Sequence, residues 1–203
     1  MKKLGASVTE EFGHIECSVP DGLHGATVTL SFPSVGATEN IILAAVRANG
    51  ITRITGAAKE PEIVYLCEFL NRCGAKIKGI GTECIHIEGV SKLYACRYKI
   101  PADRIVAGTY LMSALITKGS VLLKNAPVCE MCCTLQNLSK MGARIRCNEN
   151  EIYIAYNKPL RALEVETEVY PGFPTDLQSP MLVLLSQTEG IGVIKETIYE
   201  NRF

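Results

Sequence analysis

The sequence has no tryptophan and few aromatic residues of any kind. Eight Tyr and five Phe are spread over 203 residues, so no aromatic platform for stacking nucleobases is evident. The 21 Lys and Arg residues balance 21 Asp and Glu residues, giving a formal net charge of zero. This balance argues against attachment to nucleic acid or to an anionic membrane by bulk charge.

Long apolar runs are also missing. The longest, Ile41–Val46 and Met181–Leu185, are far shorter than the ~20 residues that cross a bilayer. Lys2 and Lys3 are followed by no long apolar core, so the N-terminus does not resemble a signal peptide. With 47% hydrophobic and 21% charged residues, the composition predicts a globular protein of one large domain or two small ones.

Cysteine, by contrast, is abundant. Nine scattered cysteines favour reduced, buried thiols in a cytoplasmic protein over a disulfide framework. Cys129, Cys132 and Cys133 form a C-x-x-C-C cluster, but a metal site would need a second pair or histidines at ligand spacing. The three histidines are far apart in the chain, so we predict no metal and interpret the cluster as ordinary thiols on a helix.

The chain contains an internal repeat of about 69 residues. Two sets of glycines recur at this step. The first set is Gly5, Gly74 and Gly142, and the second is Gly50, Gly119 and Gly190. Two independent markers at one period indicate a true repeat.

Each complete unit has the pattern of a βαβαββ fold, in which period-2 strands alternate with helices of 3.6-residue period. The elements expected in the first copy are strand 28–32, helix 38–48, strand 51–56, helix 61–73 and strands 75–78 and 84–88. The second copy repeats them, with helices 104–117 and 130–141 and closing strands 144–147 and 151–155. Asp103 and Arg104 are interpreted as a helix start or a salt bridge.

Both ends of the chain hold only half a unit. Residues 163–203 supply a strand, a helix over about 176–188 and a strand, and residues 1–17 supply the end of a helix and two strands. A half unit cannot bury its apolar face alone, so we expect another segment or a partner to complete it.

Five strings along the whole chain resemble the UDP-N-acetylglucosamine 1-carboxyvinyltransferase family. They are PSVGATEN at 33–40, EPEI at 60–63, PADRI at 101–105, PGFPTD at 171–176 and TIYENRF at 197–203. The resemblance implies an α/β (α+β) fold, an inside-out α/β barrel (alpha-beta prism) of two globular domains with three repeats each and a cleft between them. Family chains are about twice as long. We therefore expect an internal fragment whose residues 1–98 belong to the first domain and 99–203 to the second.

The resemblance also implies a reaction of bacterial peptidoglycan (cell wall) synthesis. The enolpyruvyl group of phosphoenolpyruvate passes to the 3′-hydroxyl of UDP-N-acetylglucosamine, and phosphate is released through a tetrahedral intermediate. No metal or organic cofactor is needed. The implied partners are these two small molecules, with no nucleic acid and no membrane, and self-association that completes the half repeats stays open.

The first group of candidate site residues lies between a strand and a helix. Ser34-Val35-Gly36 forms either a plain turn with Ser34 as helix cap or an anion site built from backbone N–H groups. The resemblance places Phe32, Pro33, Ser34, Val35 and Gly36 against UDP-N-acetylglucosamine. Some family members have lysine where this chain has Phe32.

The second group lies near the end of the chain. From the residues alone, Asp176 is a first-turn acid or cap, and Arg202 is a solvated arginine. The resemblance makes Asp176 the general base for the 3′-hydroxyl, Arg202 a cation for phosphoenolpyruvate, and Ile198 a backbone contact to the sugar. Pro180 stands where the family usually has glutamine, which makes the local helix geometry a point to test.

The family's proton-donor cysteine matches a position upstream of Met1, as do its Lys-Asn pair and a further arginine, so none of the nine cysteines takes the donor role. We therefore expect little turnover from this chain alone. The alternative function is a non-catalytic nucleotide-sugar-binding or assembly module, in which residues 163–203 and 1–17 complete each other within one chain or between chains.

Overall fold

The structure is a computed structural model that describes residues 1–202. Phe203, the last residue of the string 197–203, lies outside the described residues. The chain divides into two compact units, one of residues 1–100 and one from Pro101 onward. The assignment of 1–98 and 99–203 to two domains of a longer enzyme stays a prediction. No described helix combines the length and the apolar character that a membrane span requires.

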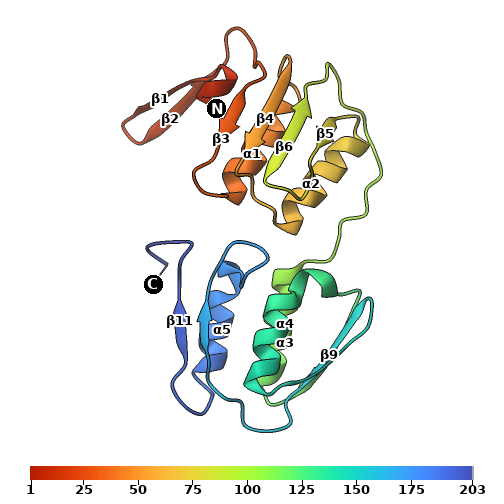
Figure 1. The fold of residues 1–203 in the computed structure, drawn as a ribbon, viewed down its shortest axis with the longest axis vertical. Coiled ribbons are helices and arrows are strands. Elements are labelled where there is room, and N and C mark those ends of the chain that lie inside the picture. The colour runs from red at the N-terminus through yellow and green to blue at the C-terminus, as the bar shows by residue number, and fades with distance from the viewer. Residues whose placement is uncertain (203) are drawn as a thin grey trace. The chain divides into compact units, whose positions relative to one another are not determined.

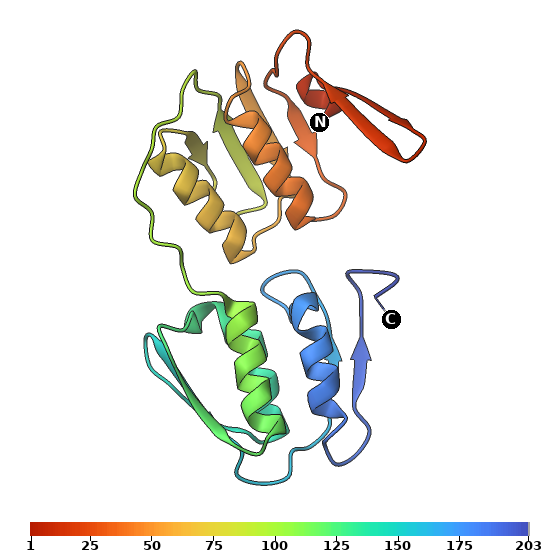
Figure 2. The ribbon, with the colours of Figure 1, turned by 180° about the vertical axis from the view of Figure 1, so that it is seen from behind.

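The first unit is built on a four-stranded sheet in the order β3-β4-β6-β5. Its strands are β3 (Thr27–Thr29), β4 (Ile51–Thr55), β5 (Lys76–Lys78) and β6 (Cys84–Glu88). β3 runs parallel to β4, while β6 is antiparallel to both β4 and β5. Helices α1 (Val35–Ala45) and α2 (Pro61–Arg72) cover one face of this sheet (Figures 1 and 2). Side chains such as Ile42, Ile54 and Ile63 are fully buried between the layers.

The expected strand 28–32 and helix 38–48 are displaced towards the N-terminus. β3 ends at Thr29, and α1 begins at Val35 and ends at Ala45. The helix begins early because Ser34 caps it, and the Ser34 side chain accepts a hydrogen bond from the Ala37 N–H at 3.3 Å. The second helix and the two closing strands of this copy lie close to their expected positions.

The N-terminal half unit forms a hairpin. After a short 3₁₀ helix, η1 (Lys2–Leu4), strands β1 (Ser7–Glu11) and β2 (His14–Ser18) pair antiparallel. No side chain of either strand is buried, and Phe12 at the turn and Ile15 are 99% and 70% exposed. The hairpin therefore leaves its apolar side chains uncovered, as the sequence predicts for half a unit, whereas Leu4 of η1 is fully buried in the core of the first unit.

The second unit begins with α3 (Arg104–Ile116), and its other elements follow the repeat. They are β7 (Ser120–Lys124), η2 (Val128–Met131), α4 (Cys132–Met141), β8 (Arg144–Cys147) and β9 (Glu151–Ala155). The three strands form an antiparallel sheet in the order β7-β9-β8. Leu111, Leu115, Leu138 and Met141 are fully or almost fully buried against it.

The second copy lacks the opening strand of a βαβαββ unit, so the expectation of a full repeat is wrong at this point. Residues 89–103 contain no strand. This segment instead packs on the first unit, where the Tyr94 N–H donates to the Cys73 carbonyl oxygen at 2.7 Å. The Tyr98 ring lies edge-on to Phe69, with the ring centroids 5.6 Å apart. These contacts hold the segment on the first unit, and among the described strands β7 pairs only with β9.

The C-terminal half unit has the expected strand–helix–strand order. Strands β10 (Glu164–Glu166) and β11 (Val193–Lys195) pair in parallel, and the helical part comprises η3 (Thr175–Leu177) and α5 (Gln178–Leu185). Pro180 lies in the first turn of α5, where a missing N–H breaks no intrahelical hydrogen bond. The proline at position 180, where the family usually has glutamine, therefore leaves α5 regular.

The α/β class is confirmed, and the barrel is not closed within residues 1–202. The described strands form four separate sheets of two, two, four and three strands. α3 and α5, the first helices of two successive repeats, lie side by side in both views (Figures 1 and 2). Gly108 of α3 permits the close approach of η3, which leads directly into α5, because a Cβ at Gly108 would come within 2.5 Å of Leu177 Cδ1.

Candidate functional site

The first candidate group, Phe32–Gly36, forms the turn from β3 into α1. Ser34 is the N-cap residue, which confirms the capping interpretation of its side chain. The N–H groups of Val35 and Gly36 belong to the first turn and have no carbonyl acceptor within the helix. A Cβ placed on Gly36 would meet no atom within 4 Å, so the space above this amide is open. No acidic residue lies in the first turn of α1, and the turn can therefore receive an anion.

Thr38 holds this turn in place. Its buried hydroxyl donates to the Ser34 carbonyl oxygen at 2.8 Å and accepts from the Ala58 N–H at 3.1 Å. The hydroxyl thus links the first turn of α1 to the loop that follows β4. Such a link keeps the exposed amides in one geometry before any ligand arrives.

The second candidate group lies in the second unit, where the structure brings Asp176 and Arg202 together. Arg202 Nη2 is 3.3 Å from Asp176 Oδ1, and Nη1 donates to the Thr175 hydroxyl at 2.7 Å. The Arg202 side chain is 29% exposed and that of Asp176 is 61% exposed. The Arg202 guanidinium also lies 5.4 Å from the centre of the Tyr199 ring. A carboxylate and a guanidinium that solvent reaches can both serve a bound substrate.

Ile198 belongs to the same segment as Arg202. Its side chain is half-buried, and its N–H donates to Glu196 Oε1 at 2.9 Å. Its backbone is therefore held in position by a side chain that the sequence did not single out.

The interpretation of the sequence missed two residues, Thr175 and Glu196. The Glu196 carboxylate accepts from the N–H groups of Ile198 and Tyr199 and from the Thr175 hydroxyl. Partial burial alone would raise the pKa of this carboxyl, but these hydrogen bonds outweigh it and hold the pKa below its ordinary value. For Thr175, the string 171–176 that contains it is the one sequence signal. Glu196, between Lys195 and Thr197, belongs to no distinguishing sequence pattern.

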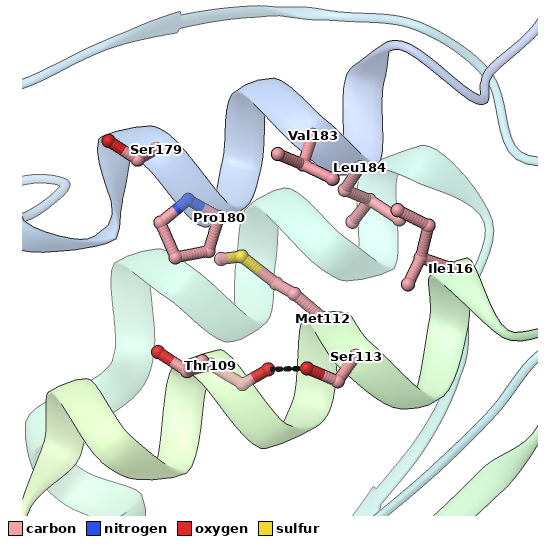
Figure 3. Close-up of a pocket in the computed structure, with 8 residues that line it drawn as sticks. All are labelled: Thr109, Met112, Ser113, Ile116, Ser179, Pro180, Val183 and Leu184. Atoms are coloured by element: carbon pink, nitrogen blue, oxygen red, sulfur yellow. Dashed lines mark hydrogen bonds between the residues drawn. The ribbon is translucent and has the colours of Figure 1, made fainter.

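An apolar groove lies between α3 and α5 and has a volume of about 320 Å³ (Figure 3). Met112 and Ile116 line it from α3, and Pro180 and Val183 line it from α5. The Ser113 hydroxyl on its wall donates to the Thr109 carbonyl oxygen at 2.8 Å. None of the described residues that line this groove is titratable, so the groove itself offers no group for acid–base chemistry.

The nine cysteines are all free thiols. Within residues 1–202, no three His, Cys, Asp or Glu side chains are grouped closely enough to hold a metal ion. Burial, with a smaller effect of Glu68, raises the pKa of the Cys67 thiol to about 11. Such a thiol is a poor nucleophile at neutral pH.

Asp103 marks the start of α3, which confirms that interpretation. Its Oδ1 accepts from the N–H groups of Ile105 and Val106 at 2.7 and 3.0 Å. Asp103 is thus a capping residue, whereas Asp176 is an acidic residue in the first turn of η3, whose N-cap residue is Pro174.

Comparison with known proteins shows one family along the whole chain. The family model described as EPSP synthase (3-phosphoshikimate 1-carboxyvinyltransferase) matches residues 1–203. A UDP-N-acetylglucosamine 1-carboxyvinyltransferase of Halothermothrix orenii is 47% identical over 202 residues, covering 100% of this chain and 48% of the relative. A second one, from Geobacillus kaustophilus, is 48% identical over 200 residues, covering 98% of this chain and 46% of the relative. The chain thus spans about half the length of the curated relatives it matches.

Solved structures show the same fold. The enolpyruvyl transferase NikO from Streptomyces tendae superposes with a TM-score of 0.87 at 21% identity, covering 100% of this chain and 51% of that one. The EPSP synthase of Acinetobacter baumannii superposes with a TM-score of 0.62 at 22% identity, covering 95% of this chain and 46% of that one. The resemblance read from the five strings is therefore confirmed at the level of family and fold.

Proposed function

Because the chain belongs to the EPSP synthase family of carboxyvinyl transferases, we propose that it takes part in enolpyruvyl transfer from phosphoenolpyruvate to UDP-N-acetylglucosamine. The acceptor is the 3′-hydroxyl of the amino sugar, and the products are the enolpyruvyl ether and phosphate. The names of the relatives at 47 and 48% identity favour this acceptor.

The observation that carries the proposal is the pairing of Asp176 with Arg202 at 3.3 Å. In the proposed reaction, Asp176 accepts the proton of the 3′-hydroxyl while the hydroxyl oxygen bonds to C2 of phosphoenolpyruvate. The methylene carbon takes up a proton, which by the family resemblance comes from the proton-donor cysteine that matches a position upstream of Met1, and a tetrahedral adduct results. Loss of a proton from that carbon and departure of phosphate then restore the double bond. Arg202 stabilises the charge on the phosphate or carboxylate throughout.

The turn Phe32–Gly36 supplies the proposed contact to the nucleotide. A diphosphate at the start of α1 would accept hydrogen bonds from the first-turn amides, assisted by the helix dipole. The absence of a Cβ at Gly36 allows a close approach to its backbone. This contact lies in the first unit, whereas Asp176, Ile198 and Arg202 lie in the second.

Equilibrium binding of UDP-N-acetylglucosamine tests the proposal. We expect Asp176→Asn to weaken the affinity about tenfold, because a charged hydrogen bond to the 3′-hydroxyl is lost. Asp103→Asn is the matched control, since asparagine caps a helix as well as aspartate does. Equal effects of the two substitutions would contradict a role for Asp176 at the substrate.

A second candidate function, an assembly module, is favoured by the groove between α3 and α5 and by the exposed hairpin β1–β2. Sedimentation velocity at tens of micromolar tests it. A dimer that Val183→Glu on the groove dissociates, and that Leu43→Glu on α1 leaves intact, would support assembly through this groove. A monomer at all concentrations would contradict it.

A further inference from the structure

The segment from Glu196 to Arg202 is held by one carboxylate. Glu196 Oε1 accepts from the N–H groups of Ile198 and Tyr199 at 2.9 and 3.1 Å, and Oε2 accepts from the Thr175 hydroxyl at 2.9 Å. The first two bonds fold the segment back on itself, and the third ties it to η3. Glu196 therefore joins the two stretches of chain that carry the candidate base and the candidate cation.

The Thr175 hydroxyl is polarised by this arrangement. A hydroxyl has one hydrogen, and here it is directed to Glu196 Oε2, so the oxygen lone pairs of Thr175 remain available. Arg202 Nη1 donates to that oxygen at 2.7 Å. The Glu196 carboxylate thus fixes the direction from which the Thr175 oxygen accepts a hydrogen bond. Through that bond it also fixes the position of the Arg202 guanidinium.

Other contacts of Arg202 are weaker restraints. Its pair with Asp176 is longer, at 3.3 Å, and joins a carboxylate that is largely exposed, and exposed ion pairs contribute little. The Tyr199 ring, 5.4 Å away, restrains the guanidinium only in one direction.

The fold of the segment does not depend on Glu196 alone. The Thr167 hydroxyl, which also interacts with the Glu196 carboxylate, accepts from the Thr197 N–H at 2.9 Å. The Thr197 hydroxyl donates to the Thr167 carbonyl oxygen, a bond in which Glu196 takes no part. These bonds fasten the chain just after β11 to the end of β10. Loss of the Glu196 carboxylate should therefore loosen residues 198–202 and leave the unit folded.

We propose that Glu196 is a positioning residue for the transfer reaction, which orders the backbone at Ile198 directly and sets Arg202 beside Asp176 through the Thr175 hydroxyl. This role rests on the proposed function. Glu196 acts through its neighbours and does not contact the reacting atoms.

The test compares Glu196→Gln with Glu200→Gln, the same change at an exposed site in the same segment. Amide hydrogen exchange at Ile198 and Tyr199 and the NMR signals of the Arg202 guanidinium are measured without ligand. We expect Glu196→Gln to speed exchange about tenfold and to let the Arg202 guanidinium rotate freely, because a charged acceptor is replaced by a neutral amide. Glu200→Gln should change neither.

Two variants of Thr175 separate the ordering of the backbone at Ile198 and Tyr199 from the placement of Arg202. Thr175→Val removes the hydroxyl and should free the Arg202 guanidinium while exchange at Ile198 and Tyr199 stays slow. Thr175→Ser restores the hydroxyl and should restore the Arg202 signals. The midpoint of thermal unfolding should stay within a few degrees for all four variants, which distinguishes positioning from loss of fold.

The affinity for UDP-N-acetylglucosamine completes the test. We expect Glu196→Gln to raise the dissociation constant about tenfold. Unchanged exchange and unchanged Arg202 signals in Glu196→Gln would overturn the positioning role even if the ligand binds. Absence of binding to the unaltered chain would instead overturn the proposed function, and with it the positioning role.

Discussion

Arg202 and Asp176, which lie 26 positions apart in the chain, meet at 3.3 Å between Nη2 and Oδ1. The contact joins the residue expected to bind phosphoenolpyruvate to the residue expected to take the proton of the acceptor hydroxyl. A base and a cation at this distance can act on two substrates that react with each other. Because the Asp176 carboxylate is largely exposed, the pair contributes little to stability.

The first prediction tests whether the Asp176 carboxylate contributes to stability. Asp176→Ala should change the free energy of unfolding by less than about 1 kcal/mol, because exposed ion pairs contribute little. Urea denaturation of the chain measures this change. A loss several times larger would show that the carboxylate is structural, which would weaken its assignment as a base.

The second prediction concerns Ser34, which caps α1. Ser34→Ala should destabilise the first unit by about 1 kcal/mol, because the Ala37 N–H loses its acceptor. Ser34→Asp and Ser34→Asn should both keep the cap. Only Ser34→Asp places a negative charge where the diphosphate is proposed to bind, so it alone should abolish binding of UDP-N-acetylglucosamine. Equal binding by the aspartate and asparagine variants would contradict a diphosphate at this turn.

The third prediction compares two glycines of the first unit. Gly36→Ala should stabilise α1 by about 0.5–1 kcal/mol, because a Cβ there meets open space and alanine favours the helix. It should at the same time weaken binding of the nucleotide sugar. Gly89→Ala should cost about 1–3 kcal/mol or more, because its Cβ would come within 1.6 Å of the Ala48 carbonyl oxygen. Denaturant unfolding of both variants gives the sign of each change in stability. A stabilised Gly89→Ala would show that Gly89 does not pack against the turn at Ala48 after α1 as described.

The fourth prediction is a pH dependence. Hydrogen bonds hold the pKa of Glu196 below its ordinary value near 4.5 in the folded state. Its contribution to stability is therefore complete above that value and is lost as the pH falls through the lower folded pKa. The protection of the Ile198 and Tyr199 amides, measured as the intrinsic exchange rate at each pH divided by the observed rate, should be high at neutral pH and fall in acid.

A carbon NMR titration of the Glu196 carboxyl measures this pKa directly. Thr175→Val removes one of the hydrogen bonds to the carboxylate and should move the pKa upward. A folded-state pKa at or above the ordinary value would contradict the hydrogen-bond arrangement around Glu196.

The sequence predicts the α/β class and most elements because local signals and tertiary packing agree in them. Pro61 marks the start of α2, and the period-2 pattern of β6 gives both its ends. The apolar stripe alone predicts that α1 begins at residue 38, whereas the cap at Ser34 makes it begin at Val35. The missing opening strand of the second copy could not be predicted, because it depends on Tyr94 and Tyr98 packing against the first unit.

The candidate site is likewise predicted from the sequence only in part. Asp176, Ile198 and Arg202 were predicted from the strings that contain them. Their mutual geometry was not predictable from a local pattern, because it depends on hydrogen bonds between residues 27 and 21 positions apart, from Arg202 to Thr175 and from Thr175 to Glu196. A carboxylate whose function is to hold a neighbouring backbone leaves no periodic signal in the sequence.

The most direct test of the account is a calorimetric titration of the 203-residue chain with UDP-N-acetylglucosamine and, separately, with shikimate 3-phosphate, the acceptor named in the family description. If the chain takes part in the proposed transfer, we expect saturable one-to-one binding of UDP-N-acetylglucosamine in the micromolar range and no binding of shikimate 3-phosphate. Binding of shikimate 3-phosphate alone, or of neither compound at millimolar concentration, would contradict it.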